Sequence, residues 1–229
     1  LFRSYLASGF ADSLGLPITR IQHHHAHLAA CLGEHQWPRD GGPVAALVMD
    51  GLGLGDDGTL WGGELLLGDY TAYRRVAHLR PAALVGGDAA SREPWRNLLM
   101  RLDQAGLADL ADQWLAHQPR GLVRAAARQG LNAPACSSVG RLFDAVAAAL
   151  GICRDRQTYE GEAGMRLEAL VDIDQLAVVE PYPFVMQGNV IDPAPMLHAL
   201  LRDQRLGLAP ALLSARFHSG LAQAFCAPA

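Results

Sequence analysis

The stretch VAALVMDGLGLGDDGTLWGGELLL, residues 44–67, determines the fold that we expect for this chain. Its first six residues, 44–49, are all apolar, and a run of this length suits a strand that is buried on both faces of a sheet. Asp50 follows at the carboxyl end of that strand, where open α/β sheets bind their ligands. A glycine-rich segment then occupies residues 51–58, and strand-forming residues return over 59–67. The segment therefore predicts two strands joined by a glycine-rich connection that starts with a carboxylate.

Outward from this hairpin, the sequence predicts an α/β fold with a head over residues 1–90 and a mostly helical body over 91–229. In the head we expect a helix over 4–14, an extended segment over 17–22, a helix over about 25–35 and a third strand over 71–79. In the body we expect helices interrupted near 118–120, 130–136 and 155–160, an irregular segment over 181–195, and helices over about 194–206 and 209–225.

Composition narrows the possible function classes. The 229 residues carry 19 basic and 23 acidic side chains, a net charge of −4, so we expect neither nucleic acid nor membrane as a partner. Every basic residue is arginine, which excludes a P-loop lysine and a lysine Schiff base. Four scattered cysteines and the lack of a long apolar run favour a cytoplasmic protein. Because the chain begins with Leu1 rather than methionine, we expect it to be part of a longer protein.

Four of the nine histidines lie within QHHHAH, residues 22–27. If a helix begins near His23, then His23 and His27 occupy positions i and i+4 and share one face. Two imidazoles at this spacing can hold one metal ion, and Asp50 can add a carboxylate. Two histidines and one carboxylate are typical of mononuclear non-haem iron, and zinc also accepts them. The alternative is a capping or hydrogen-bonded histidine cluster without a metal.

Other polar residues near these segments are candidates for catalysis. We expect His24 and His25 to point away from the metal and to contact substrate or support the ligands. Asp57, in the acidic part of the glycine-rich segment, is a third candidate. No spacing rule selects one of the three.

Two segments are candidates for binding a nucleotide or a phosphate. Gly53, Gly55 and Gly58 could let backbone amides approach an anion closely, as phosphate-binding loops require. The alternative is an ordinary glycine-rich hairpin with exposed acids. Residues 137–144, SSVGRLFD, predict a helix whose free N-terminal amides favour a phosphate and whose Asp144 could accept ribose hydroxyls. The alternative is a well-capped helix with a surface aspartate.

Taken together and in this order, six segments resemble the C-terminal carbamoyltransferase domain of the HypF family of [NiFe]-hydrogenase maturation proteins. They are IQHHHAHLAACLGEH (21–35), VMDGLGLGDDGTLWGGE (48–64), YRRVAHLRP (73–81), GGDAASREPWR (86–96), SSVGRLFDAVAAALG (137–151) and YEGEAGMRLE (159–168). That domain is similar to the threonylcarbamoyl transferase TsaD. The resemblance therefore implies an incomplete TsaD-like version of the actin/sugar-kinase/Hsp70 fold, with a largely helical second half.

The resemblance also implies an activity and its partners. It implies transfer of a carbamoyl group from ATP-derived carbamoyl adenylate to the C-terminal cysteine thiolate of HypE, a step in making the cyanide ligands of the hydrogenase. Acylphosphatase-like, zinc-finger and adenylate-forming domains of HypF would cooperate with this one. On the family motif, the metal positions match His23, His27 and Asp50. The nucleotide-contacting positions of the family match Gly140, Asp144 and the segment Tyr159–Glu162. Within that segment, Glu162 is the candidate for contacting the nucleotide.

The chain departs from the family pattern in two places. The SGG loop and the acidic residue after it do not occur before Ala229, and the strand-and-hairpin lobe that would precede the histidines is missing. We therefore expect a partial transferase module. Two other functions remain open: a metal-dependent phosphohydrolase or nucleotide-binding enzyme on the same scaffold, and a docking and folding module without chemistry of its own.

Overall fold

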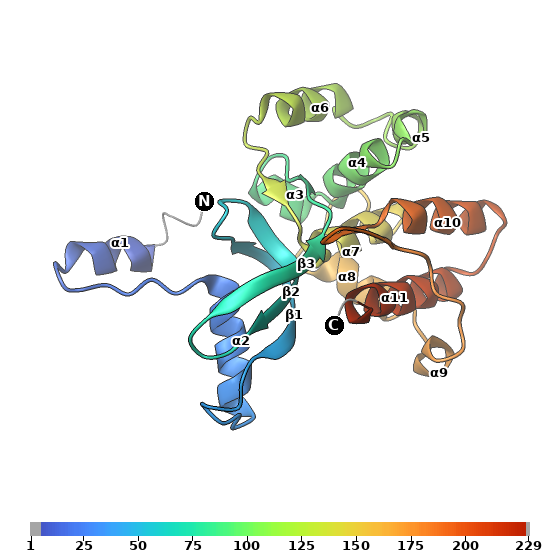
Figure 1. Cartoon of the computed structure of the whole chain (residues 1–229). Helices are drawn as coiled ribbons and strands as arrows, with labels where there is room; N and C mark the ends of the chain where they lie inside the picture. Colours follow the sequence, from blue (N-terminus) through green and yellow to red (C-terminus); the bar gives the residue numbers. More distant parts are fainter. Residues whose placement is uncertain (1–5, 228–229) are drawn as a thin grey trace.

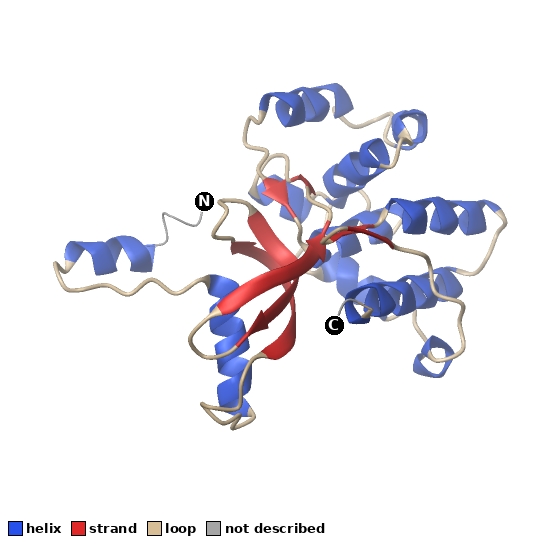
Figure 2. Ribbon diagram, viewed as in Figure 1, coloured by secondary structure: helices blue, strands red, loops and turns tan. Residues whose placement is uncertain are grey.

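The computed structural model describes residues 6–227, which form one mixed β-sheet flanked by helices (Figure 1, Figure 2). The strand order is β4-β5-β2-β3-β7-β6, with β1 paired to β2. The strands are β1 (Val44–Leu54), β2 (Leu60–Gly68), β3 (Tyr73–Leu79), β4 (Ala82–Ala83), β5 (Ala135–Cys136), β6 (Val185–Gln187) and β7 (Val190–Asp192). The helices are α1 (Leu6–Ser13), α2 (His23–Glu34), α3 (Asp88–Arg92), α4 (Pro94–Gln104), α5 (Ala108–Trp114), α6 (Arg120–Gln129), α7 (Val139–Ala149), α8 (Glu162–Glu168), α9 (Ile173–Leu176), α10 (Ala194–Arg205) and α11 (Pro210–Cys226). The expected α/β class is confirmed.

β1 and β2 form the expected antiparallel hairpin, but β1 is longer than its apolar run. The strand continues to Leu54, so the glycine-rich segment begins inside the sheet. Pairing with β2 is regular up to Met49 and resumes at Gly53. Between these two points, residues 50–52 lie opposite Gly62 alone, which makes a β-bulge. Because bulges bend a strand and redirect its side chains, this one determines where the carboxylate after the apolar run points.

The strand that is buried on both faces is β2, whereas we expected this of residues 44–49. Leu65 belongs to the large core beneath the helical body, and the next residue, Leu66, belongs to a smaller core beneath α2. Adjacent residues of a strand point to opposite faces, so β2 separates the two cores. The prediction for residues 44–49 was wrong because no helix in the described part of the chain covers Leu47 or Met49, which are each 45% exposed.

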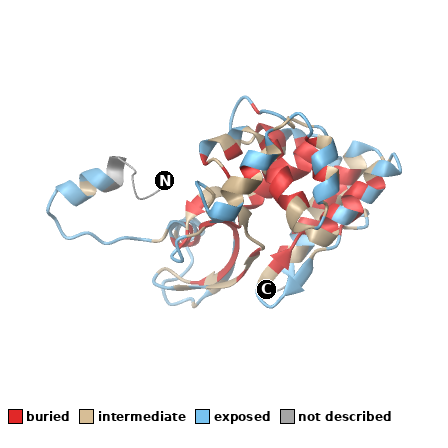
Figure 3. Cartoon of the chain, turned by 90° about the horizontal axis from the view of Figure 1, so that it is seen from above, coloured by how far each residue is buried: buried red, intermediate tan, exposed pale blue. Residues whose placement is uncertain are grey.

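Helix α2 begins at His23, two residues earlier than expected, because Gln22 caps it. The Gln22 side chain accepts a hydrogen bond from the backbone N–H of His25, which satisfies one free amide of the first turn. Leu28 and Leu32 of this helix pack against β1 and β2. Residues 17–22 form no strand, and they connect α2 to α1, which stands apart from the rest of the chain (Figure 1, Figure 3).

Buried side chains are concentrated in the helical body (Figure 3). Helix α7 is its centre: residues 145–149 are fully buried, and the helix contacts α4, α8 and β1. The alanines of this segment let neighbouring backbones approach closely. The expected interruptions between the helices are confirmed. The helices expected over about 194–206 and 209–225 are also confirmed, as α10 and α11.

The segment over 181–195 is more regular than its prolines indicated. It contains the hairpin β6–β7, whose turn includes Gly188 at a φ of 62°. His78 and Leu79 of β3 pair in parallel with Val190 and Ile191 of β7, so the hairpin extends the sheet. Strands of three residues give too little periodicity to be found from sequence. Among residues 6–227, no helix combines the length and the apolar character needed to cross a bilayer.

Candidate metal centre

The three side chains selected as metal ligands lie together in the structure. His23 and His27 come from α2, and Asp50 comes from the bulge of β1. His23 Nε2 lies 2.9 Å from Asp50 Oδ2 and 3.2 Å from His27 Nε2. One ligand atom of each residue lies within 4.8 Å of the other two. The predicted convergence is confirmed, and since Gln22 caps the helix, these imidazoles do not serve as caps.

Contacts from two other elements hold Asp50 in place. Ser138, the N-cap of α7, donates its hydroxyl to the backbone oxygen of Asp50 at 2.9 Å. On the opposite strand, a Cβ atom at position 62 would lie 2.5 Å from the same oxygen, so only glycine fits there. The bulge is therefore fixed between β2 and the start of α7, and the Asp50 carboxylate faces α2.

The residues present fit a divalent metal ion. Two ligand atoms bound at zinc–ligand distances in a tetrahedral arrangement lie about 3.3 Å apart. The His23–His27 and His23–Asp50 separations of 3.2 and 2.9 Å are near this value. The side chains of His23 and Asp50 are 48% and 27% exposed, so a ligand from outside can reach them. The donor set suits zinc or iron.

His24 and His25 have different surroundings, although both were expected to point away from the metal. His24 is fully buried, with Nε2 lying 3.7 Å from Asp50 Oδ2, so this ring does not point away from the ligands, and its place is compatible with the expected supporting role. Burial, together with the charge of His23, lowers the pKa of His24 to about 4, which leaves the ring neutral near pH 7. His25 instead contacts the backbone oxygen of Asp69 at 2.9 Å and stacks near Tyr73.

The glycines proposed to hold a phosphate have other roles in this structure. The amides of Gly55 and Gly58 donate to backbone oxygens within the hairpin turn, so they are not free for an anion. A Cβ atom at Gly53 would lie 2.4 Å from the ring of His24, and one at Gly55 would lie 2.1 Å from Trp61. These two glycines thus leave room for neighbouring rings.

Asp57 also has a structural role. Its Oδ1 accepts hydrogen bonds from the amide and the hydroxyl of Thr59 at 2.9 and 2.7 Å, and from Trp61 Nε1 at 3.0 Å. Partial burial acts to raise the pKa of Asp57, but these hydrogen bonds outweigh it and lower the pKa. A carboxylate with so many donors is a weak base, so the structure does not favour Asp57 for catalysis.

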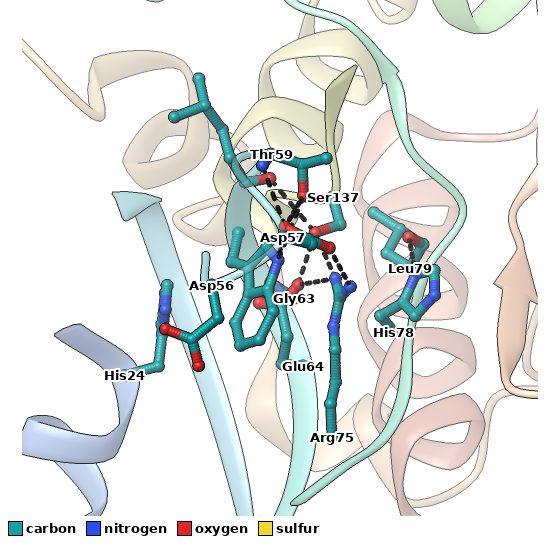
Figure 4. A network of polar contacts seen from close by, with 12 residues as sticks. His24, Asp56, Asp57, Thr59, Gly63, Glu64, Arg75, His78, Leu79 and Ser137 are labelled. Carbon is teal, nitrogen blue, oxygen red and sulfur yellow. Dashed lines mark hydrogen bonds and ion pairs between the residues drawn. The ribbon is translucent and has the colours of Figure 1, made fainter. Parts of the chain in front are cut away.

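A buried ion pair beside the site was not found from the sequence (Figure 4). Glu64 is fully buried, and one carboxylate oxygen accepts hydrogen bonds from the amides of Gly62 and Gly63 at 2.5 and 2.6 Å. The other oxygen binds Arg75 at 2.7 Å and the Ser137 hydroxyl. Burial raises the pKa of Glu64, against the effect of these donors. The sequence contained one indication of this ion pair: Glu64 is the charged residue within the apolar strand sequence LWGGELLLG. A carboxylate that is buried in such a strand requires hydrogen-bonding or charged partners.

The same arginine connects this pair to the hairpin turn. The guanidinium of Arg75 lies 4.1 Å from the centre of the Trp61 ring, and Nη1 lies 3.2 Å from Asp57 Oδ2. Arg75 therefore ties the turn of the β1–β2 hairpin to Glu64 and, through Ser137, to the start of α7 (Figure 4).

The expected nucleotide-binding residues fall into an open and a buried group. Gly140, in the first turn of α7, lies against the bulge: a Cβ atom there would lie 3.3 Å from Gly51 Cα. Glu160 lies in the loop before α8, and its Oε1 would lie 3.5 Å from a Cβ atom built at Gly51. The start of α7 and this loop therefore both lie beside the bulge that carries Asp50.

Asp144 and Glu162 belong to the buried group. Asp144 is 1% exposed and lies 3.0 Å from Arg141 Nη1, so it is not the surface residue that one alternative proposed. The Glu162 carboxylate accepts hydrogen bonds from the amide and hydroxyl of Thr158 at 2.5 and 2.8 Å, which lower its pKa. Neither carboxylate faces solvent in this structure, and their contact with a nucleotide stays a prediction.

Asp144 makes the stability of the chain depend on pH. Burial raises its pKa from 3.8 to about 7, although Arg141 opposes the change. Between these values the folded state holds a proton that the unfolded chain has released, so the contribution of Asp144 to stability falls as pH rises. We expect Asp144→Asn to gain stability relative to the unchanged chain between about pH 4 and pH 7. Urea unfolding of both proteins across this range measures the difference. Exposed Asp109→Asn is the control, and parallel curves for Asp144→Asn would contradict the prediction.

Comparison with known proteins places these features in a family. One family model, "Carbamoyltransferase, Kae1-like Domain, second subdomain", matches residues 46–229, and another, "HypF Kae1-like domain", matches residues 3–34. A carbamoyltransferase HypF of Rhodobacter capsulatus is 58% identical over 219 residues, which are 96% of this chain and 29% of the relative. A carbamoyltransferase HypF homolog of Cupriavidus necator is 39% identical over 234 residues, covering 97% of this chain and 58% of that protein.

Solved structures agree with the sequence relatives. Full-length HypF in its phosphate- and nucleotide-bound form matches with a TM-score of 0.86 and 31% identity, covering 96% of this chain and 34% of that one. The HypF of T. kodakarensis matches with a TM-score of 0.78 and 28% identity, covering 97% and 30%. The fold is thus that of a Kae1-like domain. The chain belongs to the HypF carbamoyltransferase family, and it spans less than a third of the length of its Rhodobacter relative.

Proposed function

We propose that this chain is the part of a carbamoyltransferase that passes a carbamoyl group from carbamoyl adenylate to the C-terminal cysteine thiolate of a HypE-like acceptor protein. The observation that carries the proposal is the convergence of His23, His27 and Asp50, in a chain that belongs to the HypF family. These residues would hold one iron or zinc ion, which supplies a Lewis acid for a carbonyl or phosphate oxygen.

The reaction is an acyl transfer. The sulfur of the acceptor thiolate forms a bond to the carbamoyl carbon, the bond from that carbon to the phosphate oxygen breaks, and AMP leaves with the electron pair. Because the nucleophile belongs to the acceptor, none of the four cysteines of this chain is needed. The adenylate would lie at the start of α7, where Gly140 lies against the bulge and the N-terminal end of a helix favours a phosphate group. Acylphosphatase-like, zinc-finger and adenylate-forming domains would supply the carbamoyl adenylate.

The test places this chain in a longer protein. The matching 219-residue segment of the Rhodobacter relative is replaced by this chain, and transfer of label from carbamoyl phosphate to the acceptor cysteine is measured with ATP present. We expect His27→Ala to reduce transfer at least a hundredfold. Loss of a residue that only supports a metal ligand lowers activity about 10–100-fold, and loss of a ligand itself should lower it more. The control is His35→Ala, an exposed histidine of the same region.

Normal transfer by His27→Ala would reject the assignment. Hydrolysis of ATP or carbamoyl phosphate without acceptor, and no transfer, would instead favour a phosphohydrolase. Binding of the acceptor with neither metal nor turnover would favour a docking module.

A further inference from the structure

The ring of His24 is held rigidly beside the candidate metal ligands. It is fully buried in the first turn of α2, and the missing side chain of Gly53 provides the space for it. The ring of Trp61 lies on another side, with 5.7 Å between the ring centres. A side chain enclosed by a strand and an indole has one available orientation, so the direction of each ring nitrogen is set by the fold. Figure 4 shows this ring on α2, facing the hairpin.

Hydrogen bonds of the neighbouring Gln22 determine which nitrogen of His24 carries the proton. The oxygen of the Gln22 amide is identified because it accepts the backbone N–H of His25 at 2.7 Å. The amide nitrogen is then a donor, and it contacts the backbone oxygen of Leu54 at 3.1 Å and His24 Nδ1 at 3.2 Å. His24 Nδ1 therefore accepts a hydrogen bond, and a neutral ring must carry its proton on Nε2.

The protonated nitrogen points toward Asp50 but does not reach it. His24 Nε2 lies 3.7 Å from Asp50 Oδ2, beyond hydrogen-bond distance, and has no hydrogen-bond partner in the described part of the chain. A buried donor without a partner is destabilising, so such atoms are usually paired in the functional state of a protein. The nearest anionic oxygen is the one that also contacts His23 at 2.9 Å.

We propose that His24 is a positioning residue that donates a hydrogen bond from Nε2 to the Asp50 carboxylate when a divalent cation is bound, and that it is not itself a ligand. This inference rests on the proposed metal site. A nitrogen that carries a proton cannot coordinate a metal, and the Gln22 amide keeps the proton there. His23 Nε2 donates a proton to Asp50 Oδ2, and to hold a cation it would release that proton to solvent and keep its ring proton on Nδ1, so Asp50 Oδ2 would lose this donor. The carboxylate can then accept the Nε2–H of His24, which fixes its orientation toward the cation.

Two substitutions separate the donor from the shape of the ring. His24→Phe keeps a planar ring without a donor, and His24→Gln places an amide N–H near the position of Nε2. The probe is Zn²⁺ alone, titrated against a chromophoric chelator with the 229-residue chain. We expect His24→Phe to bind Zn²⁺ about 10–100-fold more weakly, as for other residues that support a ligand. His24→Gln is expected to recover most of the affinity, which a purely structural role of the ring would not allow.

A second measurement tests the proton position directly in the unchanged chain. Nitrogen-15 NMR of the imidazoles should show His24 with its proton on Nε2, and a proton on Nδ1 would overturn the inference. Unchanged Zn²⁺ affinity of a folded His24→Phe variant would also overturn it, while leaving the metal site in place. If the unchanged chain bound no Zn²⁺, the metal site and this role of His24 would both be rejected. Loss of a ligand band from the Co²⁺ spectrum of His24→Phe would show that His24 coordinates the metal, against the proposal.

Discussion

Replacing His27 with alanine is expected to weaken Zn²⁺ binding by this chain at least a hundredfold. His27 Nε2 lies 3.2 Å from His23 Nε2, and both belong to the set of three ligand atoms within 4.8 Å of one another. Loss of a residue that only supports a ligand costs about 10–100-fold in metal affinity, so loss of a ligand should cost more. His27 is exposed, so the substitution leaves the core intact. Chelator competition measures the affinity, and circular dichroism confirms the fold.

The matched control is His117→Ala. His117 also pairs with an aspartate on the surface, with Nε2 lying 2.8 Å from Asp155 Oδ1, but it belongs to no group of three ligands in the described chain. If both variants bound Zn²⁺ as the unchanged chain does, the three converging residues would not be a metal site. A loss in both would indicate general association of zinc with histidines.

Replacing Glu64 with glutamine is expected to lower the free energy of unfolding by about 3 kcal/mol, since breaking a buried ion pair costs about 3–5 kcal/mol. Both oxygens of Glu64 accept hydrogen bonds, from Gly62 and Gly63 on one side and from Arg75 on the other. Glutamine turns one oxygen into a donor that faces other donors. Arg75, only 16% exposed at its side chain, also loses its buried counter-charge.

Thermal unfolding provides the measurement for Glu64→Gln. For a chain of this size, the expected loss corresponds to a decrease of about 6–12 °C in Tm. Glu34→Gln makes the same chemical change at an exposed position of α2 and should change stability by less than about 0.5 kcal/mol. A Tm for Glu64→Gln equal to that of the control would show that the ion pair with Arg75 does not stabilise the fold.

The ligand set could be predicted because it depends on local order. Helical geometry places His23 and His27 on one face if the helix begins near His23, and the structure shows that it begins there. An aspartate after an apolar strand is also visible in the sequence. What the sequence could not provide was the bulge opposite Gly62, because strand register depends on the partner strand and not on the strand alone.

The surroundings of the site were harder to predict for the same reason. The glycines over 51–58 were interpreted as an anion-binding loop, yet Gly53 makes room for the ring of His24, which lies 29 residues earlier in the chain, and Gly55 makes room for the ring of Trp61 on β2. Glu64 and Arg75 are separated by eleven residues and become partners only when β2 and β3 pair. Their burial depends on α7, which arrives more than sixty residues later.

The amino-acid sequence by itself determined the α/β class, the main helices and strands, and the three residues proposed to hold a metal ion. It did so because backbone periodicity, helix capping and ligand spacing are properties of neighbouring residues. Only the tertiary structure decided that β2 is the doubly buried strand, that His24 faces Asp50, and that Glu64 pairs with Arg75. Those features depend on which surfaces of the chain pack against each other in the folded state. Burial between these surfaces then shifts the pKa values of the enclosed side chains and so determines which of them are charged.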